Sequence, residues 1–271
     1  MIIPQEIVDL FIEDLAQRIN EPDSFQALLS CSYASRAVNH RCREHLFSSI
    51  STSASKHHVY PAPPRSKISL LEDLLECDNK IGAYIQHLHI DLGFSGSTVP
   101  ELEAHLPRVL ELIRMSEGSL KSVEISTRSM PMKFHELPPD VQGALFRCLE
   151  QATVSTLKLA FIVAVPIQIF MHSNIKHLLI REVIFGYPFQ GAQPNPRPEL
   201  NPTRLHTLQA DRFIIFLASH LTLAENADSE KMRLIFSMLR TLSVRITGRM
   251  DVMGFRVIMQ AAATSLVTLD L

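Results

Sequence analysis

The sequence lacks the short motifs that mark the commonest enzyme sites. Its 271 residues include no tryptophan and only nine glycines, which do not gather into the phosphate-cradling patterns G-x-G-x-x-G or G-x-x-x-x-G-K-[ST]. The hydrolase patterns G-x-S-x-G and H-E-x-x-H are missing as well. Pairs such as Cys148 and His172 are expected by chance in a chain with four cysteines and twelve histidines. We therefore expect no catalytic residues, no metal and no cofactor.

An excess of charge of either sign is also lacking. Lysine and arginine number 26 and aspartate and glutamate 28, a net charge of −2, and the basic residues are not interleaved with aromatics. Neither nucleic acid nor an anionic membrane is the expected partner. The longest apolar run, "LKLAFIVAVPIQIF", is broken by Lys158, Pro166 and Gln168, so it is too short to span a bilayer.

The cysteines and the composition bear on the compartment. No C-x-x-C pair occurs, and no N-terminal signal peptide is recognisable, so the cysteines are interpreted as free thiols in a reducing compartment. A chain with 46% apolar and 20% charged residues is expected to fold. We expect a soluble cytoplasmic and/or nuclear protein.

The first fifty residues have the pattern of three short helices. Pro4 suits a first helical turn, and apolar residues then recur at helical spacing at Ile7, Leu10, Phe11, Leu15 and Ile19. After a break at "NEPDSF", residues 25–50 are again helical in period and are predicted to divide into two helices. So small a unit buries little of its own surface. Either it caps the following domain, or its apolar edge at Ile3, Pro4 and Ile7 docks into a partner.

The same residues resemble the F-box domain. "IPQEIVDLFIEDL" is similar to the F-box opening L-P-x-E-[LIV], here Ile3-Pro4-Gln5-Glu6-Ile7. "CSYASRAVNHRCREHLFSSI" resembles the second half of F-box domains in a large fungal family, with its C-S-x-V-C-R-x-W stretch and later H-L-F. The residues kept are Cys31, Ser32, Arg36, His45, Leu46 and Phe47, and those that depart are Ala34, Ser35 and Val38.

The resemblance implies a partner and a role. F-box domains dock onto a Skp-type adaptor that is carried by a cullin–RING ubiquitin ligase of the SCF type, while the rest of the protein captures a substrate. It implies adaptor contacts at Ile3, Pro4, Ile7, Leu28, Leu46 and Phe47.

A short apolar motif recurs in the remainder of the chain. Residues 51–67 are rich in serine and proline and are predicted to link an N-terminal domain, 1–50, to a second one, 68–271. In the second, an aliphatic, two residues, an aliphatic, one residue and an aliphatic recur about every 30 residues. The seven copies, which we call the motif, begin at Ile85, Leu120, Val154, Ile175, Leu205, Leu239 and Leu266. Their alternating second halves predict short strands, and such a period is typical of a solenoid.

Helical segments separate these copies. Ser69 and Glu72 form a capping box at "LLEDLLEC", and Pro107 is expected to kink or split the helix "ELEAHLPRVLELIRM". The order of strands and helices resembles a leucine-rich-repeat solenoid, with parallel strands on the concave face and helices outside. The expected class is α+β or α/β, and an ordinary α/β domain with a parallel sheet is the alternative.

Two segments remain open to more than one interpretation. Residues 186–203 form a proline-rich loop that is either an insertion or a substrate contact. The last motif, "LVTLDL", has no polar cap after it, so either the chain is a fragment or something else covers that edge.

Together these patterns lead to the hypothesis of a substrate-recognition subunit of a ubiquitin ligase, for an unknown protein substrate. The rival hypotheses are a non-catalytic repeat scaffold whose F-box-like cap no longer binds the adaptor, supported by the departures at Ala34, Ser35 and Val38, and an unrecognised α/β enzyme.

Overall fold

The protein is an α/β structure built around a parallel sheet, as the sequence predicts. The structure is a computed structural model. It describes residues 4–52, 66–92, 99–116, 118–127, 131–171, 173–186, 204–212, 217–218 and 234–271. Over these ranges the strands form one eight-stranded sheet and one three-stranded sheet, and both are parallel. Ile3 and nearly all of the loop 186–203 lie outside the described residues.

Three helices precede the sheet: α1 (Gln5–Gln17), α2 (Pro22–Cys31) and α3 (Arg36–Leu46). Proline opens the first turn of α2, and the Ser35 hydroxyl accepts a hydrogen bond from the Val38 N–H at 3.3 Å to cap α3. The helices enclose a small core of their own, made of Ile12, Leu15, Leu28 and Cys42.

The large sheet follows the sequence motif copy by copy. Its strands, in spatial and chain order, are β1 (Ser49–Ser51), β2 (His87–Asp91), β3 (Ser122–Ser126), β5 (Thr156–Ala160), β7 (His177–Arg181), β9 (Thr207–Asp211), β10 (Thr241–Arg245) and β11 (Thr268–Asp270). Every strand from β2 onward begins at the third residue of a motif. The predicted strands are therefore confirmed, and they pair in sequence order.

The first strand was not predicted. Phe47 and Ile50 take the first and fourth motif positions and pack against the core of the sheet, whereas Leu46 packs against the helical core. Along the chain, the boundary between the two cores therefore lies between Leu46 and Phe47, not after residue 50. The predicted linker begins inside β1, because one apolar pair followed by polar residues is too weak a pattern to indicate a strand.

A shared hydrogen bond fixes the register of the sheet. The carbonyl oxygen of the second motif residue accepts the N–H groups of the second and third residues of the next copy. Gln86 O accepts from Lys121 N at 2.8 Å and from Ser122 N at 3.0 Å. Arg240 O accepts in the same way from Val267 and Thr268. Because the same pair of bonds recurs from β1 to β11, equivalent motif residues lie side by side across the sheet.

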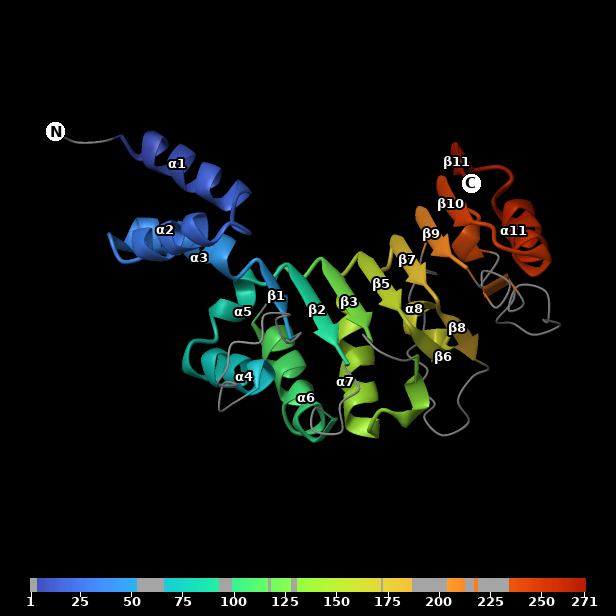
Figure 1. Ribbon diagram of the computed structural model, residues 1–271, viewed down its shortest axis with the longest axis horizontal. Coiled ribbons are helices and arrows are strands. Elements are labelled where there is room, and N and C mark those ends of the chain that lie inside the picture. The colour runs from blue at the N-terminus through green and yellow to red at the C-terminus, as the bar shows by residue number, and fades with distance from the viewer. Residues whose placement is uncertain are drawn as a thin grey trace.

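Helices cover the convex side of the sheet (Figure 1). They are α4 (Lys67–Cys77), α5 (Ile81–Tyr84), α6 (Val99–Met115), α7 (Pro139–Leu149), α8 (Gln168–Met171) and α11 (Arg249–Ala262). The first, fourth and sixth motif residues of the inner copies point toward these helices and are almost completely buried. Ile85, Leu157 and Ile180 are examples of the three positions in that order. Figure 1 shows the sheet curving, with α1–α3 at one end and β11 at the other.

Two details of the predicted helices are wrong. The helix α4 begins at Lys67, and its cap is Ser66, whose hydroxyl accepts a hydrogen bond from Ser69 N at 3.2 Å. The capping box at Ser69 was placed three residues too late. The helix α6 also continues through Pro107 and does not divide there.

The small sheet was not foreseen. It consists of β4 (Met132–Lys133), β6 (Ile162–Pro166) and β8 (Ile184–Gly186), with the 3₁₀ turn η1 (Phe134–Glu136) after β4. Phe161 and Glu182, directly after β5 and β7, have φ angles of 59° and 51°. These left-handed residues turn the chain from the large sheet toward the small one.

Candidate functional site

The helix α1 has two apolar faces. Ile12 and Leu15 are buried against α2 and α3, and Val8 packs beside them. On another side, Ile7, Leu10 and Phe11 are 55%, 66% and 53% exposed. Leu10 and Phe11 lie three and four residues after Ile7, which places both of them next to Ile7 on the helix surface. We call Ile7, Leu10 and Phe11 the outer stripe of α1.

The residues predicted to contact an adaptor are divided by the structure. Pro4 is exposed and directly precedes α1, and Ile7 belongs to the outer stripe. Leu28 has no exposed surface, so it stabilises the helical core and offers nothing to a partner in this conformation. Leu46 is half-buried against the helical core, and Phe47 is half-buried against the sheet. The predicted adaptor contact at Leu28 is therefore corrected, whereas contacts at Leu46 and Phe47, which keep part of their surface exposed, stay predictions.

The sequence analysis recognised a single apolar series on α1, at Ile7, Leu10, Phe11, Leu15 and Ile19, and did not separate the two faces of the helix. A second series, Val8, Ile12, Leu15 and Ile19, has the same period and is the one that packs. The presence of two overlapping series was the signal that the helix has two apolar faces.

An ion pair links α1 to α3. Arg41 Nη2 lies 2.6 Å from Glu13 Oε1 of α1, and Arg41 Nη1 lies 2.7 Å from Glu44 Oε2 within α3. The hydrogen bond to Glu44 raises the pKa of the Arg41 guanidinium despite partial desolvation. Because each exposed pair contributes little free energy, the packing of Ile12 and Leu15 on the helical core is what holds α1 and its outer stripe in place.

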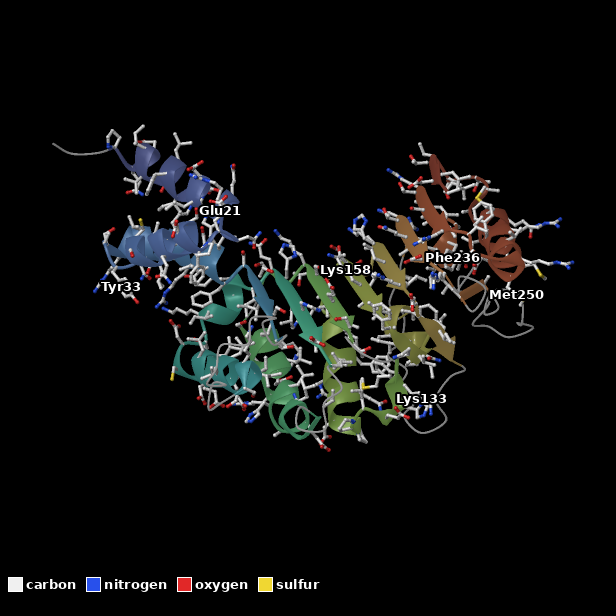
Figure 2. The ribbon with its side chains drawn as sticks, viewed as in Figure 1. Glu21, Tyr33, Lys133, Lys158, Phe236 and Met250 are labelled. Carbon is white, nitrogen blue, oxygen red and sulfur yellow. The ribbon has the colours of Figure 1, made fainter. Side chains whose placement is uncertain are left out.

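The concave face of the large sheet is a second exposed surface, and it is polar. Its side chains come from the third, fifth and seventh motif positions, which alternate with the buried positions. Threonine, serine and histidine fill most of the third position, and Leu179 is the large apolar residue of the fifth. Figure 2 shows Lys158 on this side of the sheet. We call this surface the open face.

Charges on the open face are largely matched. Glu124 lies 3.7 Å from both His89 and Lys158, and Asp211 lies 3.8 Å from Arg181 and 3.7 Å from Arg245.

Hydrogen bonds also link the open face across strands. The His89 ring bonds to Ser51 at 3.0 Å and to Ser126 at 2.8 Å. Burial, followed by the charges of Lys121 and Lys158, lowers the pKa of His87. A polar surface whose side chains are held by hydrogen bonds across strands suits recognition of a polar partner.

A polar hollow of about 520 Å³ lies between the helical unit and the beginning of the sheet. It is lined by Arg41, Glu44, His45, Ser48, Ala83, Tyr84, Gln86, His87 and Ser119. A second hollow of about 310 Å³, lined mostly by apolar side chains such as Leu92 and Val141, lies between α6 and α7.

Two of the four cysteines, Cys42 and Cys148, are buried thiols. Burial raises the pKa of Cys148 to about 12 and that of Cys42 to about 11, so both thiols are protonated at neutral pH. His172 lies outside the described residues. In the part of the chain that the structure covers, no three histidine, cysteine or acidic side chains gather as metal ligands would. No helix in that part has both the length and the apolar character needed to cross a membrane.

No protein-family model matches this chain, and no curated protein matches it significantly.

Proposed function

We propose that this protein is a substrate-recognition subunit of a cullin–RING ubiquitin ligase of the SCF type. In this proposal α1–α3 form an F-box-like unit that binds a Skp-type adaptor, and the repeats form a leucine-rich-repeat-like solenoid that binds a protein substrate. The observation that carries the proposal is the outer stripe, three large apolar side chains exposed beside Pro4.

The outer stripe is what a helix-in-groove contact requires. Ile7, Leu10 and Phe11 each keep more than half of their surface in water. Burying a whole side chain of this size contributes about 1.5–3 kcal/mol, so covering the exposed half of all three contributes roughly 2–5 kcal/mol. A groove with apolar pockets at this spacing would gain that energy, and α1 is already folded and packed against α2 and α3.

The proposed role of the sheet is to position a substrate. The eight strands of the large sheet follow one another in chain order with equivalent residues aligned, which supports a repeat solenoid. Its open face is polar, and none of the helices in the described part of the chain covers it. A substrate held there would be carried to the ubiquitin-charged enzyme of the ligase, where proximity raises the effective concentration of its lysines.

A repeat scaffold without adaptor binding is the second candidate. It is favoured by Leu28, Leu46 and Phe47, which are engaged in internal packing and leave a smaller surface for an adaptor. Departures from the F-box pattern at Ala34, Ser35 and Val38 support it as well.

The test is co-expression with a Skp-type adaptor followed by gel filtration. We expect the wild-type chain to co-elute with the adaptor and an Ile7→Asp, Phe11→Asp variant to elute alone, because charge on the outer stripe is incompatible with an apolar groove. Leu70→Asp is the control, since Leu70 is a large apolar residue on α4 that is 48% exposed and lies outside the outer stripe. A wild-type chain that is folded by circular dichroism yet elutes alone would favour the scaffold.

A further inference from the structure

A row of basic side chains lies along one margin of the open face, where the strands begin. The second motif residue directly precedes each strand. At this position stand Ser48, Gln86, Lys121, Ser155, Lys176, His206, Arg240 and Val267. Neither this position nor the third contains an acidic residue in any copy, and the third adds His87 and His177. We call Lys176, His177, His206 and Arg240 the basic rim.

The basic rim is compact because the register aligns it. Lys176, His206 and Arg240 precede the adjacent strands β7, β9 and β10, and each carbonyl bonds to the next strand at the same position. Neighbouring strands lie about 4.8 Å apart, so Lys176 and Arg240 are separated by roughly 10 Å along the sheet. Side chains at this position do meet across strands, since Lys121 Nζ donates to Gln86 Oε1 at 2.8 Å.

Electrostatic interaction within the rim is already evident at His206. Burial lowers the pKa of His206, and the charges of Arg240, Lys176 and His177 lower it further. The positive charges of Lys176 and Arg240 therefore disfavour a proton on His206. An anion placed among these side chains would offset that effect.

Within the described ranges of the chain, the rim differs from the rest of the open face because no carboxylate pairs with its lysine or arginine. Glu124 and Asp211, at the fifth and seventh positions, are occupied by Lys158, His89, Arg181 and Arg245. Among the residues that the structure describes, no carboxylate lies within 4.0 Å of the Lys176 or Arg240 side chain, and both are exposed. In a chain of net charge −2, this local excess is not a general property of the surface.

We propose that the basic rim binds an acidic, extended segment of a partner protein that runs across β7, β9 and β10. An extended peptide advances about 3.3 Å per residue, so two anionic side chains three residues apart match the roughly 10 Å between Lys176 and Arg240. The anions are carboxylates or phosphates, since both bind lysine and arginine by charge-assisted hydrogen bonds.

A protein segment fits better than nucleic acid. A single strand of nucleic acid requires a longer basic groove with aromatic side chains for base stacking. The rim spans three strands and has no aromatic residue at its second or third positions, apart from the histidine rings. This inference deepens the proposed capture role of the open face and rests on it, but its test requires no adaptor, so the two can fail separately.

The experiment is fluorescence anisotropy of labelled ten-residue peptides with the full chain. One peptide carries two glutamates three residues apart, the second carries two phosphoserines there, and the third carries two glutamines. We expect at least one anionic peptide to bind about tenfold more tightly than the glutamine peptide, with affinity falling as salt rises. Whichever anionic peptide binds more tightly identifies the source of the charge.

Two double variants with equal loss of charge complete the test. Lys176→Gln, Arg240→Gln should lower the affinity for the anionic peptide about tenfold. Lys133→Gln, Arg256→Gln should leave it unchanged, because Lys133 lies away from the open face (Figure 2) and Arg256 is exposed on α11. Equal losses in both variants, equal binding of all three peptides, or tighter binding of a single-stranded oligonucleotide of the same charge would overturn the proposal.

Discussion

At the scale of single residues, the turns that follow the strands show how a glycine-poor chain forms its corners. Phe161, Glu182 and Arg212 occupy the left-handed region with φ between 51° and 75°, each directly after a strand. That conformation costs an L-residue with a Cβ roughly 1–2 kcal/mol. The side chains there also make contacts: Arg181 lies 5.3 Å above the Phe161 ring, and Arg212 lies 3.6 Å from Glu182.

Arg212 provides a direct test of this corner. Arg212→Gly and Arg212→Val both lose the ion pair to Glu182, but valine is β-branched and disfavours positive φ. We expect the valine variant to have a free energy of unfolding lower than the glycine variant by about 1–2 kcal/mol. Urea denaturation measures the difference.

Arg245 supplies the control for that comparison. It lies in the extended strand β10, where valine is favoured over glycine, so the order of the two substitutions should reverse. A valine variant at position 212 that matches or exceeds the glycine variant would contradict the left-handed turn.

At the scale of elements, helix α4 begins at a residue that the sequence pattern did not select. Of the two serines, only Ser69 is followed three residues later by a glutamate, Glu72, so the capping-box pattern favours Ser69. In the structure Ser66 is the cap and Ser69 is already helical. The earlier start places Ile68, which is buried, inside the first turn of the helix.

The start of α4 is tested by two alanine substitutions. Ser66→Ala should lower the free energy of unfolding by about 1 kcal/mol, because the Ser69 N–H loses its acceptor. Ser69→Ala should change it by less than about 0.5 kcal/mol, since alanine is favourable inside a helix. Thermal denaturation of both variants decides between them, and a larger effect at Ser69 would restore the later start.

At the scale of the whole molecule, the two hydrophobic cores are separate. One is enclosed by α1–α3, and the other runs without interruption from α4 to α11 beneath the sheet. The chain passes from one to the other between Leu46 and Phe47. No buried residue belongs to both cores. We therefore expect damage to one core to reduce protection from hydrogen exchange only in the part of the molecule that surrounds that core.

Two leucines in different cores test this independence. Leu28→Ala and Leu178→Ala each remove a fully buried side chain and should cost about 2–5 kcal/mol. Hydrogen–deuterium exchange should accelerate in α1–α3 for the first variant and in the strands around β7 for the second. If Leu28→Ala accelerated exchange equally in β5 to β9, the molecule would be one cooperative unit.

Much of the sheet was predictable because its information is local and repeated. Each motif specifies a strand by alternation, and seven copies indicate a stack of strands. The strand β1 and the small sheet were missed because Ser49–Ser51 carries one apolar residue and Met132–Lys133 is only two residues long. Such strands exist because neighbouring strands supply hydrogen-bond partners, which no local pattern reveals.

The sequence by itself determined the seven motif strands of the large sheet and the presence of N-terminal helices, since apolar periodicity acts within a few residues. Only the tertiary structure decided which apolar series of α1 is buried, because both series have helical spacing and the choice depends on what α2 and α3 cover. It also decided that Lys176, His206 and Arg240, about 30 residues apart in sequence, form one row. Their proximity arises from the register of β7, β9 and β10, and therefore from hydrogen bonds between distant parts of the chain.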